Sequence, residues 1–163
     1  MVNHSPFPRT LSPTLTLRPA RAGDAERVAA DLRTADRVEI EAAGEEPLQA
    51  LLRSVRASEE VYSVCHRGEP FVVFGLSATP HPLVASVWLL STDELANHRV
   101  TFMRHSRAIL DQWNARFPLL YNYVHTDNAL HRRWLKRVGF TEGATRLRGE
   151  GAEFITVTRT HVR

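Results

Sequence analysis

The sequence has one cysteine, Cys65, among its 163 residues. A single cysteine cannot form an intramolecular disulfide, and it also excludes a zinc site built from several thiolates. Cys65 lies in the strand-like run VYSVC, so we expect a buried core thiol rather than a nucleophile. This cysteine usage is typical of a reducing cytoplasm.

Long apolar runs are also missing. The run FVVFGL, residues 71 to 76, is among the longest, and a membrane-spanning helix needs roughly 20 apolar residues. The N-terminus lacks the succession of charged, apolar and small residues that is typical of a signal peptide. We therefore expect a soluble protein with no membrane partner.

Lysine is nearly absent, since Lys136 is the only one among 21 basic residues. Residues 1 to 98 hold 9 basic and 13 acidic side chains, whereas residues 99 to 163 hold 12 basic and 5 acidic ones. A basic C-terminal half is a candidate surface for nucleic acid or for an acidic protein. A strong preference for arginine also follows from a GC-rich genome, so we disfavour nucleic acid as a partner.

The eight histidines do not form a recognisable metal motif. None is arranged as H-x-x-x-H, and His98 and His105 lie seven residues apart on one predicted helix with no further ligand close in sequence. The sequence therefore predicts no metal site.

The chain divides into a short arm and one domain. Residues 1 to 14 contain Pro6, Pro8 and Pro13 without apolar periodicity, which predicts an extended arm. Residues 15 to 163 are expected to form a single domain. We expect strands over residues 15–20, 60–65, 71–79, 84–90, 119–125, 141–147 and 152–160, and helices starting near residues 25, 47, 91 and 129.

Two helices carry specific signals. Ser91 and Glu94 match a capping box at the start of the longest helix. In the helix after Asn128, the residues Leu130, Trp134 and Val138 are expected to face inward. Strands that alternate with helices after a meander predict an α/β fold with a mixed central sheet flanked by helices.

One motif resembles the GCN5-related acetyltransferases. The stretch VHTDNALHRRWLKRVGF, residues 124 to 140, is similar to that family's V-x-x-D-N followed by a helix ending in Y-E-K-L-G-F. The order of elements is also that of the family, which implies its fold. Aligned on Gly139 and Phe140, Asn128 falls on the family's asparagine, so Asn128 is the candidate contact if coenzyme A (CoA) binds.

The chain departs from that family at three places. The segment STDELANHRV has no glycine where the family has Q/R-x-x-G-x-G/A, and it brings the carboxylates of Asp93 and Glu94 to the expected phosphate position. Leu135 stands at the position of the family's tyrosine and has no proton to give. Residues 84 to 90 offer no general base. We therefore expect no catalytic residue and no cofactor.

Six stretches in order, LTLRPARAGD, VEIEAAGEEP, the W-x-x-S/T-D element, YNYVHTDN, WLKRVGF and FITVTR, resemble the internal virion protein A family of T7-like podophages over residues 15 to 160. The resemblance implies a noncatalytic virion or assembly protein, that is, a pseudoenzyme with a structural role in the internal core or in packaging of ejected proteins. Other virion proteins, and further copies of this chain, would be its partners. Its location would be the virion, or the host cytoplasm during assembly.

A basic stripe is the candidate partner contact under that hypothesis. Arg132, Arg133, Lys136 and Arg137 lie beside the buried face of their helix, where the alternative is an ordinary solvated surface. The alternative function is an acetyl-CoA-dependent N-acetyltransferase with an atypical site. It predicts acetyl-CoA in the groove between the strands that end near Leu90 and His125.

Overall fold

The computed structural model describes residues 9–149 and 151–160, which form one mixed eight-stranded sheet with the order β1-β2-β3-β4-β5-β6-β8-β7. The strands are β1 Arg9–Ser12, β2 Leu15–Pro19, β3 Glu60–His66, β4 Glu69–Ala78, β5 Val84–Ser91, β6 Leu119–His125, β7 Thr141–Gly149 and β8 Ala152–Thr160. The helices are α1 Asp24–Ala30, α2 Thr34–Ala42, α3 Pro47–Ala57, α4 Leu95–Arg116 and α5 Ala129–Arg137. The expected single-domain α/β fold with a mixed, helix-flanked sheet is confirmed.

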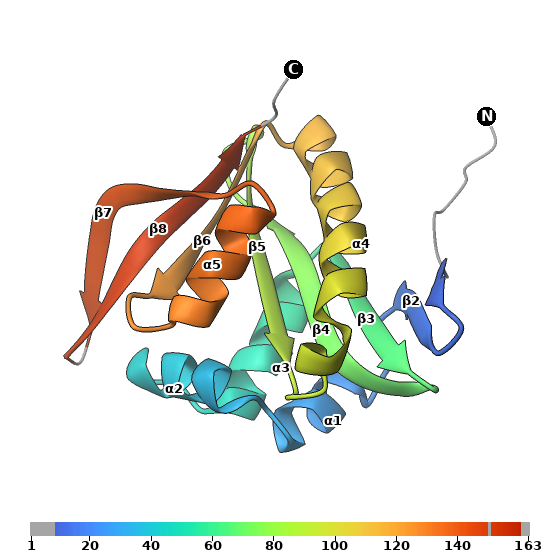
Figure 1. Ribbon diagram of the computed structural model, residues 1–163. Helices are drawn as coiled ribbons and strands as arrows, with labels where there is room; N and C mark the ends of the chain where they lie inside the picture. The colour runs from blue at the N-terminus through green and yellow to red at the C-terminus, as the bar shows by residue number, and fades with distance from the viewer. Residues whose placement is uncertain (1–8, 150, 161–163) are drawn as a thin grey trace.

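Helices cover both faces of the sheet. Figure 1 shows α4 and α5 in front of the strands, with α1, α2 and α3 behind and below them. Successive side chains of a strand point to opposite faces, so β4 supplies both cores. Phe74 and Leu76 pack with Phe102 of α4, whereas Val73 packs with Leu51 of α3. The continuous apolarity of β4 thus reflects burial on both sides.

The strands β5 and β6 are parallel neighbours only at their beginnings. Their register is Val84 with Leu119, Ala85 with Leu120 and Ser86 with Tyr121, and no further pair follows between these two described strands. Beyond Ser86, β5 continues against β4, while β6 continues against β8. The two strands therefore diverge (Figure 1). We call the space between residues 87–91 of β5 and 122–125 of β6 the wedge.

Two elements were not predicted from the sequence. Residues 9–12, within the segment expected to be an arm, form β1 and pair with β2 from Arg9 opposite Leu17. Residues 1–8 of that segment lie outside the described residues. Helix α2 was missed because it lacks an apolar stripe: among its residues only Asp36 is buried, and Val38 is exposed. Its position depends on polar contacts with distant parts of the chain, described below.

Two local predictions were wrong. Ser91 ends β5, and α4 begins after Glu94 without a side-chain cap, so there is no capping box. On α5, Leu130 is 55% exposed, whereas His131 and Leu135 are buried together with the expected Val138. Trp134 is partly buried as expected, so Leu130 alone departs from the expected inward set. Asn128 caps the helix, with Oδ1 accepting from the His131 amide at 3.2 Å.

Two other predictions concern burial and membranes. Cys65 is 2% exposed in β3, so its assignment as a buried core thiol is confirmed. Within residues 9–149 and 151–160, no helix combines the length and apolarity that crossing a bilayer demands.

Candidate functional site

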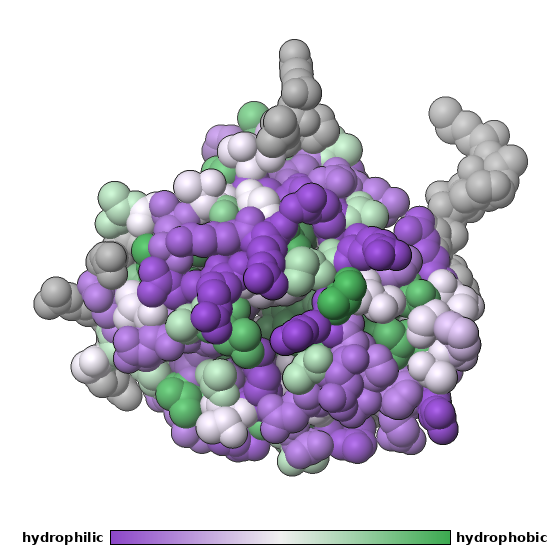
Figure 2. All heavy atoms as spheres, viewed as in Figure 1, coloured by the Kyte–Doolittle hydropathy of each residue, from purple (hydrophilic) through white to green (hydrophobic). Residues whose placement is uncertain are grey.

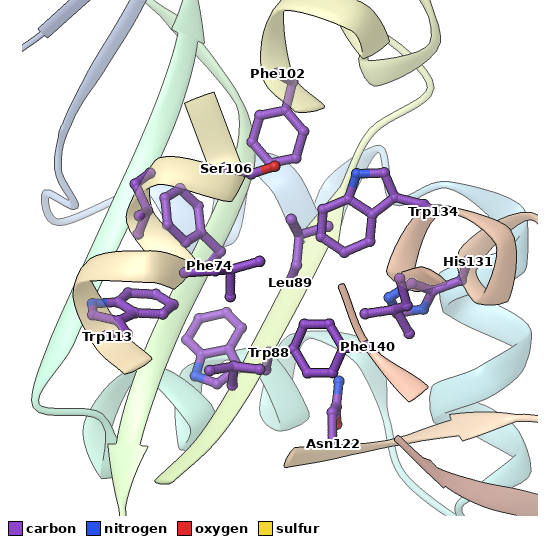
Figure 3. Close-up of a pocket in the computed structure, with 14 residues that line it drawn as sticks. Phe74, Trp88, Leu89, Phe102, Ser106, Trp113, Asn122, His131, Trp134 and Phe140 are labelled. Carbon is purple, nitrogen blue, oxygen red and sulfur yellow. The ribbon is translucent and has the colours of Figure 1, made fainter. Parts of the chain in front are cut away.

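A mostly apolar cavity of about 40 Å³ lies in the wedge, between α4 and α5. Its wall includes Leu89 of β5, Phe102 of α4 and Phe140 after α5 (Figure 3). The ring of Trp134 stacks on Phe102 with centroids 6.0 Å apart, so these two rings close the gap between the helices. Asn122, Ser106 and His131 add polar groups to the wall. Figure 2 shows a hollow on this face with hydrophilic side chains around an apolar floor.

Buried polar atoms without a hydrogen-bond partner gather around the wedge. In the part of the chain that the structure describes there are five such side-chain atoms, and four belong to Arg33, Ser91, His131 and Trp134. Ser91 ends β5, and His131 and Trp134 line the cavity. Buried polar groups are usually satisfied by protein or by bound molecules. Of these residues, His131 and Trp134 face the cavity itself, so a polar group entering it would meet unused hydrogen-bonding atoms.

The imidazole of His131 is the buried titratable group in the cavity wall. It is 7% exposed, and its Nδ1 has no hydrogen-bond partner. The carboxylate of Glu39 on α2 lies near it and accepts a hydrogen bond from Asn128 Nδ2 at 2.9 Å. Asn128 thus joins Glu39 to the first turn of α5, where His131 lies.

The surroundings of His131 and Glu39 shift the pKa of each side chain toward its neutral form. Burial lowers the pKa of His131, and the nearby carboxylates of Glu39 and Asp36 oppose this only in part. Burial raises the pKa of Glu39, against the opposing effects of His131, Asn128 and the backbone of His125. At neutral pH His131 is therefore an uncharged imidazole that can accept a proton.

Helix α2 spans the wide end of the wedge. At its start, Asp36 pairs with Arg33 at 2.6 Å and accepts from the Ser91 amide, at the end of β5, at 3.2 Å. The Arg33 amide in turn donates to the Ser91 carbonyl at 2.9 Å. Further along α2, Glu39 contacts Asn128, which follows β6. The same helix therefore fixes the ends of both diverging strands.

Of the site residues considered from the sequence, Asn128 lies at the start of α5 and Leu135 lies in the core. The side chain of Asn128, the candidate CoA contact, is engaged with Glu39 and with the His131 amide. Leu135, at the family's tyrosine position, is 3% exposed in the core. Sequence reasoning missed Glu39 and His131, because the contact between Glu39 and Asn128 joins residues 89 positions apart. The signal available was the position of His131 three residues after a helix-capping asparagine.

The basic stripe of α5 is split by its surroundings. Arg132 makes two hydrogen bonds to Glu142 at 2.7 and 3.0 Å, and Lys136 Nζ lies 3.8 Å from the same carboxylate. Arg133 and Arg137 are exposed and lie one helical turn apart, and Arg137 is three residues after Trp134. Trp134 itself is turned to α4, where its ring stacks on Phe102. Arg107 of α4 also donates to the Arg137 carbonyl, so the end of α5 lies beside α4.

The start of α4 is unsuited to bind a diphosphate through its backbone. The amides of Leu95, Ala96 and Asn97 donate to the carbonyls of residues 92 to 94 at 3.0 to 3.3 Å. The carboxylate of Glu94 adds negative charge there. The departure expected from the glycine-free segment is thus visible in the backbone itself.

No protein-family model and no curated protein sequence matches the chain. Solved structures do match it. The ribosomal-protein-S18-alanine N-acetyltransferase of Escherichia coli shares 14% identity at a TM-score of 0.63, over 91% of this chain and 95% of that one. The ribosomal-protein-alanine N-acetyltransferase of Brucella melitensis shares 12% at 0.66, over 88% and 98%. The ribosomal L7/L12 alpha-N-protein acetyltransferase RimL, in complex with CoA, shares 15% at 0.62, over 93% and 96%.

These comparisons overturn the phage interpretation. The similar structures are N-acetyltransferases, one of them with CoA bound, and nothing in them supports a noncatalytic virion protein, a structural pseudoenzyme or a podophage family. The expectation of no cofactor loses its support as well. The error arose because the missing glycines and the missing tyrosine were taken as evidence of a noncatalytic role, which the similar structures do not support. The chain has the fold of the GCN5-related N-acetyltransferases.

Proposed function

We propose that this protein is an acetyl-CoA-dependent N-acetyltransferase whose site lies in the wedge. The observation that carries the proposal is the buried imidazole of His131, which faces an apolar cavity between two diverging parallel strands. Such an arrangement combines a water-poor space with a group able to move a proton. The N-acetyltransferases with similar structures support the proposal.

The residues present fit acetyl-CoA, with apolar residues for its thioester arm and basic residues for its phosphates. The apolar wall of the wedge suits the thioester arm, and the unsatisfied Nε1 of Trp134 is a buried donor for a polar atom of that arm. A cavity of about 40 Å³ holds little more than one water molecule. The ring of Trp134 therefore has to move from Phe102 for the arm to enter.

The phosphates require another site than the start of α4. Arg133 and Arg137 belong to α5, the helix whose His131, Trp134 and Leu135 line the cavity; they are exposed and carry guanidinium groups, which bind phosphate well. We assign the diphosphate to these two residues. Arg132 and Lys136 are less suited to this role because both lie beside the carboxylate of Glu142, which offsets part of their charge.

The chemistry assigned to the chain is proton transfer. Bound acetyl-CoA would supply an acetyl thioester, whose C–S bond breaks as an acceptor amine forms the new C–N bond. The amine must lose a proton, and neutral His131 is the candidate general base. The imidazolium so formed can return the proton to the departing sulfur, a role that Leu135 cannot fill. Glu39 acts through His131, by electrostatic stabilisation of the imidazolium, and is a positioning residue.

The direct test is acetyl transfer by the purified full chain. The protein is incubated with acetyl-CoA and a panel of acceptors, comprising peptides with free N-termini, lysine side chains and small amines. Free thiol is measured by a colorimetric reagent, and acetylated product by mass spectrometry. We expect product formation with at least one acceptor class. A folded protein that neither binds acetyl-CoA nor transfers acetyl at millimolar concentrations would refute the proposal.

Replacing both Arg133 and Arg137 by alanine is expected to raise KM for acetyl-CoA roughly ten- to thirtyfold with little change in kcat. Each guanidinium contributes on the order of 1 kcal/mol to a phosphate contact at the surface, and this affects binding rather than chemistry. The matched control removes two charges from the other face of the sheet, at Arg53 and Arg56 of α3. An unchanged KM in the double variant would show that the phosphates bind elsewhere.

A further inference from the structure

Three side chains from separate parts of the chain converge beside the start of α4. His66 Nδ1 lies 2.9 Å from Glu94 Oε1, and His98 Nε2 lies 2.8 Å from the same oxygen. All three ligand atoms lie within 4.8 Å of one another. No metal site was predicted from the sequence because no histidines are arranged as H-x-x-x-H and Glu94 was not recognised as a partner ligand of His98. The fold supplies His66 from β3, and the pair Glu94 and His98 is one helical turn apart.

The spacing suits coordination of one ion. Zinc binds histidine nitrogen and carboxylate oxygen at about 2.0–2.2 Å, so two ligand atoms on one ion are separated by about 2.9–3.5 Å at octahedral or tetrahedral angles. The separations of 2.9 and 2.8 Å between Glu94 Oε1 and the two imidazole nitrogens are close to this range, and the two nitrogens lie within 4.8 Å of each other. Side-chain exposures of 30% for His66, 34% for Glu94 and 18% for His98 leave the group reachable from solvent.

Neighbouring contacts hold the three ligands in place. Asn97 Nδ2 donates to Glu94 Oε2 at 3.0 Å, which leaves Oε1 directed at the histidines. The imidazoles of His66 and His98 pack with centroids 4.6 Å apart, and Phe71 packs on His98 at 5.4 Å. His66 is also fixed by its backbone, which pairs with Leu15 and with Glu69. Such supporting contacts are a regular feature of metal sites, because they orient the ligands.

From this geometry we infer that His66, Glu94 and His98 form a binding site for a divalent transition-metal ion of the zinc type. Two imidazoles and one carboxylate suit zinc, nickel or cobalt, whereas magnesium and calcium require oxygen ligands. Three protein ligands leave a fourth position for water. The ion would tie the first turn of α4 to the end of β3. This site is separate from His131 and does not depend on the proposed acetyl transfer.

The inference is tested by metal titration of the full chain, prepared without a histidine tag and dialysed against a chelator. We expect one equivalent of zinc to bind in competition with a chromophoric chelator. Zinc at 100 times its Kd is expected to raise the melting temperature by about 5–10 °C. Cobalt is the second probe, because its visible absorption reports the coordination number.

Single variants separate a metal site from a set of hydrogen bonds. H66Q, E94Q and H98Q each keep a polar side chain of similar size and are expected to weaken zinc binding at least tenfold and to abolish the melting shift. H105Q, on the same helix one heptad later, is the matched control and is expected to bind like the wild type. If the wild type binds no zinc at millimolar concentration, or if H66Q binds it unchanged, the three side chains form only hydrogen bonds and the inference falls.

Discussion

The variant H131Q is expected to lower kcat for acetyl transfer at least 100-fold, while KM for acetyl-CoA changes little. General base catalysis by a positioned side chain is worth about 10²–10⁴-fold, and glutamine keeps the size and polarity of the group without its basicity. Initial rates at saturating acetyl-CoA measure the effect. Circular dichroism and the melting temperature establish that the variant is folded, since His131 is buried.

The pH dependence gives a second measure of the same role. The neutral imidazole is the active form, and burial lowers the pKa of His131, so activity rises with pH through a value below 6.5 and is flat above it. The H131Q variant is expected to lose this acidic limb. In E39Q the limb is expected to move to lower pH, because the Glu39 charge, which raises the pKa of His131, is gone. H105Q serves as the control, and a wild-type profile in H131Q would assign the base elsewhere.

The variant D24A is expected to destabilise the protein by about 3 kcal/mol, which corresponds to a fall in melting temperature of about 6–12 °C. Asp24 accepts from Arg18 at 2.6 and 3.0 Å, from the Arg21 amide at 2.9 Å and from Ser63 Oγ at 2.7 Å. Its removal leaves the Arg18 guanidinium, with a side chain 12% exposed, without its counter-charge. Thermal and urea unfolding measure the change.

The Asp24 contribution also depends on pH. Burial alone would raise the pKa of Asp24, but the hydrogen bonds from Arg18, Arg21 and Ser63 outweigh it, and the pKa is lowered from 3.8. A carboxylate whose pKa is lower in the folded state than in the unfolded state stabilises the folded protein at pH values above the unfolded-state pKa. This stabilisation is lost as the pH falls through the folded-state pKa. The wild type is therefore expected to lose stability below about pH 4 more steeply than D24A.

An exposed carboxylate of the same helix provides the control for both measurements. Asp31 follows the C-terminal end of α1 and is exposed. The variant D31A is expected to stay within about 0.5 kcal/mol of the wild type at every pH. Equal losses in D24A and D31A would mean that the contacts of Asp24 are not the source of the stability.

Much of the fold followed from local patterns. The apolar run of β4 and the first-turn Pro47 of α3 predicted those elements, because strand and helix periods are properties of a few neighbouring residues. Helix α2 escaped prediction because its buried residue is Asp36, an acid that no apolar period marks. For α5, the element and the inward Trp134 and Val138 were predicted, but Leu130 is exposed and His131 and Leu135 are buried instead.

The sequence by itself determined the α/β class, the buried thiol of Cys65, the Asn128 cap of α5 and the absence of glycine from residues 91 to 100. Each of these is a matter of residue type and local spacing. Only the tertiary structure decided that β5 and β6 diverge to form the wedge and that the side chains of Glu39 and Asn128, 89 positions apart, form a hydrogen bond. It also decided that His66 lies beside Glu94 and His98. These contacts depend on how β5 and β6 separate within the sheet and on how α2 and α4 pack at the strand ends. No local pattern encodes them, since the partners lie far apart in the chain and meet only when the core is packed.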